Sequence, residues 1–600
     1  MITKSFNFYS NPSIKFISIK NGVLIFVFVM TLSYIHSQTN IPGGLVEGTW
    51  TKSNSPYIIE GAILVADTKS LTIEPGVKVE FQGDYKFSVL GQLIAIGTVN
   101  DTITFTASNP SLGWLGVRFE NTSSTNDTSS FSYCKFEYGK ANWPSPLNSG
   151  GAFFIEGYSK VNISNSLIEN CYAELNGGGI FCDNGSSPNI KNNTIRNNTA
   201  KGGGGGIYAG ALCSPVIDNN NISSNVALEL SGAGIYTYDS GGSGSPIIKN
   251  NKISFNICDG GRGGGIRVLS KSASITGNII TYNEASGDIG GGGLYITKVG
   301  TGGTGNIVSH NVISNNKTFN DLDEYGGGGI YWSSNGANDL ISNNLISNNS
   351  TSKDGGGIHF FASSPTMINN TIVNNMARNG GGLFCKNSSD PNISNSIFWG
   401  NEASGSRNQI YLEDEGSDPN IYYSDIENGL LGVQSAQNTF YLGEYLNNIN
   451  LDPLFNNPSS GVGSNFDGFN SDWTLNSSVP SPCINQISPS SNTSQFDLAG
   501  NPRVHENFID MGCYESQEAT LGLKRINENT FSIYPVPATD YLRIKGKTQI
   551  SSLVIYNSKG QIVKSYSKIN NQEKIDVSNL ESGIYLIRLN NSISYKILKR

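Results

Sequence analysis

One side chain in each repeat of this sequence follows a glycine-rich unit, and these side chains are the first candidates for chemistry. Between residues 150 and 403, runs of glycine are followed by Ile or Leu and then by an aromatic or basic residue. Because side chains alternate between the two faces of a strand, this last residue is expected to point outward. The row consists of Phe181, Tyr208, Tyr236, Arg267, Tyr295, Tyr331, His359 and Phe384.

Six members of this row are aromatic, which predicts a platform for sugar rings, since the apolar face of a sugar stacks on an aromatic side chain. Under this hypothesis the carbohydrate-binding residues are Phe181, Tyr208, Tyr236, Tyr295, Tyr331 and Phe384. The alternative is a ladder of rings that stabilises the fold and is covered by loops. The sequence leaves both interpretations open.

The loops before the glycines carry about one acidic residue per repeat, and stacked carboxylates are candidate Ca²⁺ ligands. The candidate metal ligands are Asp259, Asp288, Asp321, Asp323 and Asp354. The alternative is that turns select Asp for their own geometry. Common catalytic signatures such as HExxH and GxSxG are absent from the sequence, and the GxGxxG match at Gly300–Gly305 is not followed by a helical pattern.

The repeat itself predicts the elements that position these residues. The apolar residue after the glycines recurs at intervals of 25 to 36 residues, from Ile180 to Leu383, and an Asn-x-Ile-x-x-Asn unit alternates with it. Each repeat holds two or three runs of four to six residues, separated by Gly, Asn and Ser-Pro turns, which indicates strands. Short strands that repeat around one axis predict a parallel β-helix with turns about 4.8 Å apart. Stacked Asn side chains are expected to hydrogen-bond along that axis.

Composition agrees with a solenoid and excludes an ordinary globular enzyme of this length. The 600 residues are 37% hydrophobic and include 71 Gly. The first 37 residues carry Lys4, Lys15 and Lys20 before an apolar run from Val23 to Leu32, which predicts an export signal. Export permits disulfides, and Cys483 and Cys513, which flank the same short region, are the predicted bridge.

Several motifs near the beginning of the chain carry a family resemblance. Leu71–Val77, Gly91–Thr98 and Trp114–Val117 resemble the opening turns of exported right-handed parallel β-helix proteins of the pectin-lyase-like class, and the resemblance covers about residues 45–440. That class includes lyases, hydrolases, isomerases and adhesins, so it implies the fold and not the function.

Lyases of the resembled class abstract a proton beside a uronate carboxylate, with Lys, Arg or His as the base. In this sequence Arg267 and His359 are the candidate catalytic residues, together with Arg262, Asp259 and Asp354. Arg267 and His359 are three repeats apart, about 14 Å along the axis. Because one sugar cannot contact both, the sequence favours a binding protein over an enzyme. A polysaccharide lyase or glycoside hydrolase acting on the same face is the alternative.

Two modules follow the repeats. Residues 451–516 resemble the choice-of-anchor region of surface proteins, and Asp497, Arg503, Asp510 and Glu515 within it are expected to form a structural salt-bridge cluster rather than a charged site. Residues 531–600 resemble the C-terminal sorting domain of the type IX secretion system, a small β-sandwich. Its motif residues are Pro535, Pro537, Asp540, Gly560, Gly583 and Tyr585. Residues 524–600 carry a net charge of +8 (13 Lys and Arg, 5 Asp and Glu) against −8 for the chain.

The sequence therefore predicts an all-β protein, a right-handed parallel β-helix solenoid followed by a small C-terminal β-sandwich. The expected segments are 1–37 signal peptide, 38–130 N-terminal cap and first turns, 131–440 repeats, 441–516 anchor-like region, 517–530 linker and 531–600 sorting domain. The expected function is binding of extracellular polysaccharide, or adhesion, by a protein secreted to the cell surface. Its expected partners are that polysaccharide and the type IX machinery, with no nucleic acid and no integral membrane segment after signal removal.

Overall fold

The computed structural model describes residues 4–5, 38–518 and 531–600, apart from loops at 240–242, 271, 288–289, 299–302, 320–324, 335–337, 406–407, 437–439, 490–493, 535–537, 547–548, 571–572 and 591–592. The chain divides into two compact units between residues 517 and 518. Among the described residues, regular structure consists of strands and two short 3-10 helices, η1 (Lys52–Asn54) and η2 (Gly429–Gly432). In this part of the chain no helix has the length and apolar character needed to cross a membrane.

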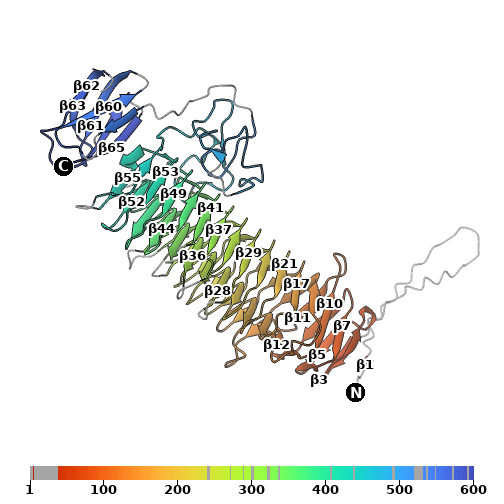
Figure 1. Ribbon diagram of the computed structural model, residues 1–600. Coiled ribbons are helices and arrows are strands. Elements are labelled where there is room, and N and C mark those ends of the chain that lie inside the picture. Colours follow the sequence, from red (N-terminus) through yellow and green to blue (C-terminus); the bar gives the residue numbers. More distant parts are fainter. Residues whose placement is uncertain are drawn as a thin grey trace, which may run out of the picture. The chain divides into compact units, whose positions relative to one another are not determined.

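A typical turn of the first unit contains four short strands that belong to four different sheets. In one turn, β17 (Val161–Ser164) lies in sheet 1, β18 (Leu167–Glu169) in sheet 2, β19 (Tyr172–Ala173) in sheet 3 and β20 (Ile180–Asp183) in sheet 4. The chain then returns to sheet 1 with β21 (Asn189–Lys191), which pairs in parallel with β17. Figure 1 shows the strands of successive turns stacked side by side along one axis.

Neighbouring strands within each sheet come from successive turns and pair in parallel, apart from β1 (Lys4–Ser5), which pairs antiparallel with β2 (Gln38–Ile41) in sheet 2. Sheets 1 and 4 contain 15 strands each, and sheet 3 contains ten. The first and last parallel strands are β4 (Gly48–Trp50) and β56 (Tyr445–Leu446) in sheet 1, β2 (Gln38–Ile41) and β54 (Asp425–Ile426) in sheet 2, β15 (Lys140–Ala141) and β51 (Glu402–Ala403) in sheet 3, and β3 (Gly44–Leu45) and β55 (Val433–Ser435) in sheet 4. The first unit is therefore a parallel β-helix, which confirms the prediction.

The two sequence units stack as the repeat predicts. The apolar residue after the glycines faces its equivalent in the next turn of sheet 4, as in Ile180 opposite Ile207 and Ile330 opposite Ile358. The Ile of the asparagine unit does the same in sheet 2, as in Ile195 opposite Ile222. These side chains are fully buried, so each strand contributes one narrow row to the core.

Asparagine side chains form two hydrogen-bonded ladders inside the β-helix. In one ladder, Asn198 Nδ2 donates to Asn225 Oδ1 at 3.0 Å and Asn225 donates in the same way to Asn256. The second ladder includes Asn193 and Asn220, joined at 3.0 Å. Because each amide both donates and accepts, a buried ladder satisfies its own polar groups.

Each glycine unit allows the backbones of successive turns to lie very close together. Gly327 has a φ of +89°, which L side chains rarely adopt. A Cβ on Gly329 would lie 2.6 Å from the carbonyl oxygen of Gly357 in the next turn. Gly328 and Gly329 donate backbone hydrogen bonds to Gly355 and Gly356. Glycine at these positions therefore gives a rigid turn.

The structure corrects the number of strands in each turn. The sequence predicts two or three, whereas the two-residue strands of sheet 3, such as β19, provide a fourth. Their inward residue is small, as at Ala173 and Ala200, so the hydrophobic pattern did not mark them. Residues 38–130 form the first turns of the same sheets.

Residues 451–516, here called the covering segment, pack on the outer face of sheet 2. Trp473 and Cys513 lie in one buried cluster with Leu345 and Val373, which point outward from that sheet. Cys513 N also donates to Thr371 Oγ1 at 3.0 Å. The covering segment contains one small antiparallel pair, β57 (Phe455–Asn457) and β58 (Asp472–Leu475). This region is thus part of the first unit rather than a separate domain.

The predicted Cys483–Cys513 bridge is absent from the structure, in which both thiols are free and buried. Cys483 Sγ contacts Asp425 Oδ2 at 3.2 Å, whereas Cys513 packs beside Val373. The two residues flank one sequence region but face different parts of the β-helix, which is why their proximity in sequence was misleading.

The second unit is a β-sandwich, as predicted. One sheet has the order β59 (Phe531–Tyr534), β60 (Tyr541–Gly546), β63 (Lys574–Asp576), and the other the order β62 (Ile562–Ile569), β61 (Ile550–Tyr556), β64 (Gly583–Leu589), β65 (Ile593–Lys599). All of these strands pair antiparallel.

Motif residues of the second unit lie at turns and at the core. Gly560 has a φ of +74° in the turn between β61 and β62. Tyr585 on β64 is buried, and its hydroxyl donates to Glu581 O. Asp540 is exposed just before β60, and Gly583 begins β64. Pro535 and Pro537, like the predicted signal peptide from residue 6 to 37 and most of the predicted linker, lie outside the described residues.

Candidate functional site

The aromatic row of sheet 4 is buried, so the prediction of an exposed sugar platform is wrong. Of its six aromatic members, Tyr208 is the most exposed at 8% and Phe384 the least at 1%. Rings of successive turns stack on one another, as in Phe181 and Tyr208 with centroids 5.2 Å apart and Tyr295 and Tyr331 with centroids 4.9 Å apart.

The glycine of each unit explains this burial. The turn folds back so far that a Cβ on Gly204 would lie 2.8 Å from Cβ of Tyr208, and a Cβ on Gly355 would lie 2.8 Å from Cβ of His359. The row points out of the sheet but lies under the backbone of its own turn. It is a structural ladder, the alternative that the sequence left open.

The two candidate catalytic residues belong to the same ladder. His359 is fully buried between Tyr331 and Phe384, and this burial lowers the pKa of His359 to about 3. The guanidinium of Arg267 lies over the rings of Tyr236 and Tyr295, at 4.8 and 5.4 Å from their centroids. His359 has no exposed surface, so the structure contradicts its assignment as a catalytic residue. Arg267 is partly exposed but packs against the rings of the ladder, and its catalytic role stays a prediction.

The predicted calcium ligands do not meet in the part of the chain that the structure describes. Asp354 is buried, and its carboxylate accepts hydrogen bonds from Arg378 and Asn379. Asp259 is exposed and accepts a hydrogen bond from Ser286. Asp288, Asp321 and Asp323 lie outside the described residues. Within those residues, no group of three or more His, Cys, Asp or Glu is arranged to hold a metal ion.

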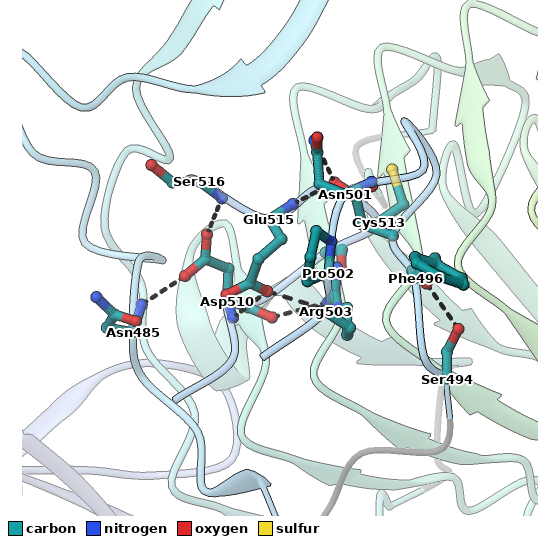
Figure 2. Close-up of polar contacts among 12 residues, drawn as sticks. Asn485, Ser494, Phe496, Asn501, Pro502, Arg503, Asp510, Cys513, Glu515 and Ser516 are labelled. Atoms are coloured by element: carbon teal, nitrogen blue, oxygen red, sulfur yellow. Dashed lines mark hydrogen bonds and ion pairs between the residues drawn. The ribbon is translucent and has the colours of Figure 1, made fainter. Parts of the chain in front are cut away.

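The charged residues of the covering segment form a buried cluster, shown in Figure 2. Arg503 Nη2 donates to the carbonyl oxygen of Asp510 at 2.9 Å. The Asp510 carboxylate accepts from the backbone of Asn485 and Ser516, and Glu515 Oε2 accepts from Asp510 N. Burial raises the pKa of both Asp510 and Glu515. These contacts hold the segment together, as expected for a structural salt-bridge cluster.

An open groove of about 390 Å³ lies at the N-terminal end of sheet 3, beside β15 and β19. It is lined by Pro110, Tyr138, Gly139, Lys140, Asn142, Asn170, Tyr172 and Glu174. Tyr138 follows β14 (Cys134–Glu137), Lys140 is on β15, and Tyr172 points outward from β19 in the next turn. The groove thus places two partly exposed tyrosines beside amide, ammonium and carboxylate groups.

The polar groups of the groove are arranged by hydrogen bonds. Tyr172 donates its hydroxyl to Glu174 Oε2 at 2.7 Å, and Lys201 Nζ donates to Glu174 Oε1 at 3.0 Å. Burial and the Glu174 carboxylate raise the pKa of Tyr172 to about 12. The hydrogen bonds that Tyr172 and Lys201 donate to Glu174 lower the pKa of Glu174. At neutral pH the phenol therefore keeps its proton and the carboxylate is ionised.

Sequence reasoning missed this groove. Tyr138 and Tyr172 lie before the first regular glycine unit, and the strands that carry their neighbours have only two residues. The available signal was Tyr138 directly after β14 and Tyr172 on β19 in the next turn, but irregular spacing hid their proximity.

Family models match both units. The model for right-handed β-helix regions matches residues 94–278 and 241–426, more than half of the chain. The model for the secretion system C-terminal sorting domain matches residues 532–600. The protein is therefore secreted or displayed at the cell surface by type IX secretion.

Individual proteins match either a short part of this chain or a larger part at low sequence identity. A stretch of 65 residues is 38% identical to beta-agarase A of Zobellia galactanivorans, and it spans 10% of this chain and 12% of that enzyme. A mannuronic acid specific polysaccharide family 6 lyase from human gut microbiota shares 13% identity, with a TM-score of 0.31 over 58% of this chain and 82% of that chain. The PL6 family alginate lyase AlyGC shares 14%, with a TM-score of 0.26 over 60% and 51%. Neither structural similarity bears on what this chain does.

Proposed function

We propose that this chain, which belongs to the right-handed β-helix family and ends in a secretion sorting domain, binds extracellular polysaccharide at the cell surface. The observation that carries the proposal is the open groove at Tyr138 and Tyr172. Partly exposed rings beside amide and charged side chains suit a sugar, because its apolar face stacks on a ring while its hydroxyls hydrogen-bond to the rim.

The electrostatics of the groove favour binding over catalysis. A general acid or base works best with a pKa near the operating pH. The pKa of Tyr172 is about 12, and that of Glu174 is held below its ordinary value, so neither exchanges a proton readily near pH 7. His359, whose pKa is about 3, is buried away from any such groove. We therefore propose that the chain is a binding protein rather than a lyase or hydrolase.

Affinity electrophoresis of the exported chain through gels that contain neutral or uronate polysaccharides tests the proposal. Tyr172→Ala is expected to reduce retention by about tenfold, since it removes a ring from the groove. Tyr422→Ala is the matched control, because Tyr422 is also partly exposed and also donates to a glutamate, Glu444, far along the chain. Equal retention of wild type and Tyr172→Ala would overturn the proposal.

A parallel assay separates binding from catalysis. The same polysaccharides are incubated with the exported chain, and new reducing ends and unsaturated uronate absorbance are followed with and without Ca²⁺. No product is expected. Product that disappears in Tyr172→Ala would make the groove an active site and would replace the binding proposal with an enzymatic one.

A further inference from the structure

One corner of the β-helix, between sheets 2 and 3, carries a column of equivalent side chains that begins at Tyr138, which lines the groove and packs partly buried against the core. Each of its residues follows a sheet 2 strand and has a φ between 54° and 59°. The uncovered part of the column consists of Tyr138, Asn170, Asn197, Ser224, Phe255 and Tyr282. We call this set the corner column.

The covering segment packs over the residues that continue the corner column toward the C-terminal end of the β-helix. The next equivalents are Asn315, Asn348 and Asn374, and their amides hydrogen-bond to the stretch 459–469 of that segment. Tyr282, the last uncovered member, has its hydroxyl 3.4 Å from Asp467 Oδ1. The uncovered part therefore extends from the groove to the edge of the covering segment.

Aromatic rings stand at both ends of the uncovered part. Phe255 is 54% exposed, and its ring stacks on that of Tyr282 with centroids 5.1 Å apart and planes at 5°. On its other side the next member is Ser224, which is too small to cover a ring. Phe255 thus presents a ring face toward Asn197 and the groove, in line with the column.

The backbone makes these aromatic residues unusual. A left-handed φ suits Asn and is strained for a bulky side chain. Most corner residues of this kind in the β-helix are Asn, as at Asn170 and Asn197, yet Phe255 adopts the same φ. Because Phe255 is more than half exposed, burial offsets little of that strain. The position of this ring is therefore not explained by burial in the β-helix.

Two of the cations beside the column are paired with carboxylates, whereas Lys140 of the groove donates to the carbonyl oxygen of Ser111. Arg196 pairs with Glu169 at 2.8 Å, and Lys201 pairs with Glu174 at 3.0 Å. Residues 1–523 carry a net charge of −16, since the remaining residues carry +8 and the chain −8. The net negative charge of residues 1–523 would repel a polyanion. Along the column such a ligand would find Arg196 and Lys201 already paired with carboxylates. The column is suited to an uncharged chain.

We propose that the corner column is an extended binding track for a neutral polysaccharide. Tyr138 and Tyr172 hold one sugar ring in the groove. Phe255 holds a second ring, four turns from Tyr138 and three turns from Tyr172, which is about 19 and about 14 Å along the axis. Asn170, Asn197 and Ser224 hydrogen-bond to the sugars between them. This inference rests on the proposed function and adds the length and charge of the ligand.

Titration calorimetry with cello- and laminari-oligosaccharides of increasing length tests the track. Affinity is expected to rise by about tenfold once an oligosaccharide is long enough to reach from Tyr172 to Phe255. Phe255→Asn is expected to abolish that rise and to leave the affinity of short oligosaccharides unchanged. This variant keeps the left-handed corner, because Asn occupies the equivalent position two turns away on either side, at Asn197 and Asn315.

The matched control is Tyr423→Asn, since Tyr423 is an exposed aromatic residue with a left-handed φ at another corner. Its affinities are expected to equal those of wild type. If Phe255→Asn binds long oligosaccharides as wild type does, the track is wrong while the groove stands. Tighter binding of alginate or polygalacturonate than of the neutral chains overturns the neutral ligand. Failure of every oligosaccharide to bind, neutral or uronate, or equal binding by Tyr172→Ala, overturns the track and the groove together.

Discussion

The thiol of Cys483 donates a hydrogen bond to the carboxylate of Asp425 over 3.2 Å, and this contact joins the covering segment to the last strand of sheet 2. Asp425 is fully buried, and burial raises its pKa to about 7. We therefore expect the stability of the junction between the β-helix and the covering segment to depend on pH.

Asp425→Asn is expected to reduce this pH dependence. A carboxyl group whose pKa is raised on folding contributes stability that is complete below its unfolded pKa of about 3.9 and is lost as the pH rises through the folded value. Wild type should therefore lose stability as the pH rises from about 4 to about 7, by on the order of 4 kcal/mol. The variant should lose less over this range by that amount, and the pH dependence that remains comes from other buried carboxyl groups such as Asp510 and Glu515. Chemical denaturation from pH 4 to 9 measures the difference, and parallel curves would contradict the assignment.

All eight cysteines are expected to be free thiols in the exported protein. The structure buries each one, and burial raises the pKa of Cys134 and Cys171 to about 12, which suppresses the reactive thiolate. Alkylation should be negligible in the native state. In denaturant without reductant it should modify eight residues, as counted by intact mass. Modification of six would show a disulfide, and a sample reduced beforehand gives the reference value.

The repeat was predictable because its information is local. Spacing alone placed Ile330 opposite Ile358 and identified which Asn residues stack, since a parallel β-helix turns the sequence period directly into register. The burial of Tyr331 was not predictable in that way. Its outward direction followed from strand alternation, but its cover is the glycine backbone of its own turn, whose path depends on contacts with the turn beyond.

The groove and the covering segment were harder to predict because they depend on non-repetitive sequence. Tyr138 and Tyr172 meet through a turn of irregular length, and Cys513 reaches Thr371 across 142 residues of sequence. No periodic pattern encodes such contacts. The same reasoning explains why Cys483 and Cys513, close in sequence, were wrongly paired.

His359→Phe is expected to preserve the fold and improve its stability in acid. In wild type His359 is buried and neutral, with a pKa of about 3 against 6.5 unfolded, and its Nε2 has no hydrogen-bond partner among the described residues. Stability from a base with a lowered pKa is present above the unfolded value and is lost as the pH falls toward 3, by on the order of 4 kcal/mol. Phe, which occupies equivalent positions at Phe181 and Phe384, cannot protonate. Thermal unfolding from pH 7 to 3 tests this, and equal acid sensitivity would contradict it.

Gly329→Ala is expected to destabilise the β-helix by about 3 kcal/mol, because its Cβ would lie 2.6 Å from a backbone carbonyl oxygen that the next turn holds in place. Gly185→Asn is the control. Gly185 has a φ of +78° that Asn tolerates, and a Cβ there meets nothing within 4 Å. Its stability should stay within about 0.5 kcal/mol of wild type. Equal stability of Gly329→Ala and wild type would mean that close approach between turns does not require glycine.

Phe255→Asn is expected to separate stability from binding. The substitution relieves a left-handed backbone strain of about 1 kcal/mol and loses an exposed ring stack on Tyr282 of similar or smaller size, so the free energy of unfolding should stay level or rise by up to about 1 kcal/mol. A residue retained for structure would show the opposite result. Denaturation of wild type and variant, measured beside the oligosaccharide titration, gives both quantities on the same protein. A variant that is less stable by more than about 1 kcal/mol would make the Phe255–Tyr282 pair part of the scaffold, because the ring would then contribute more to folding than its strain costs.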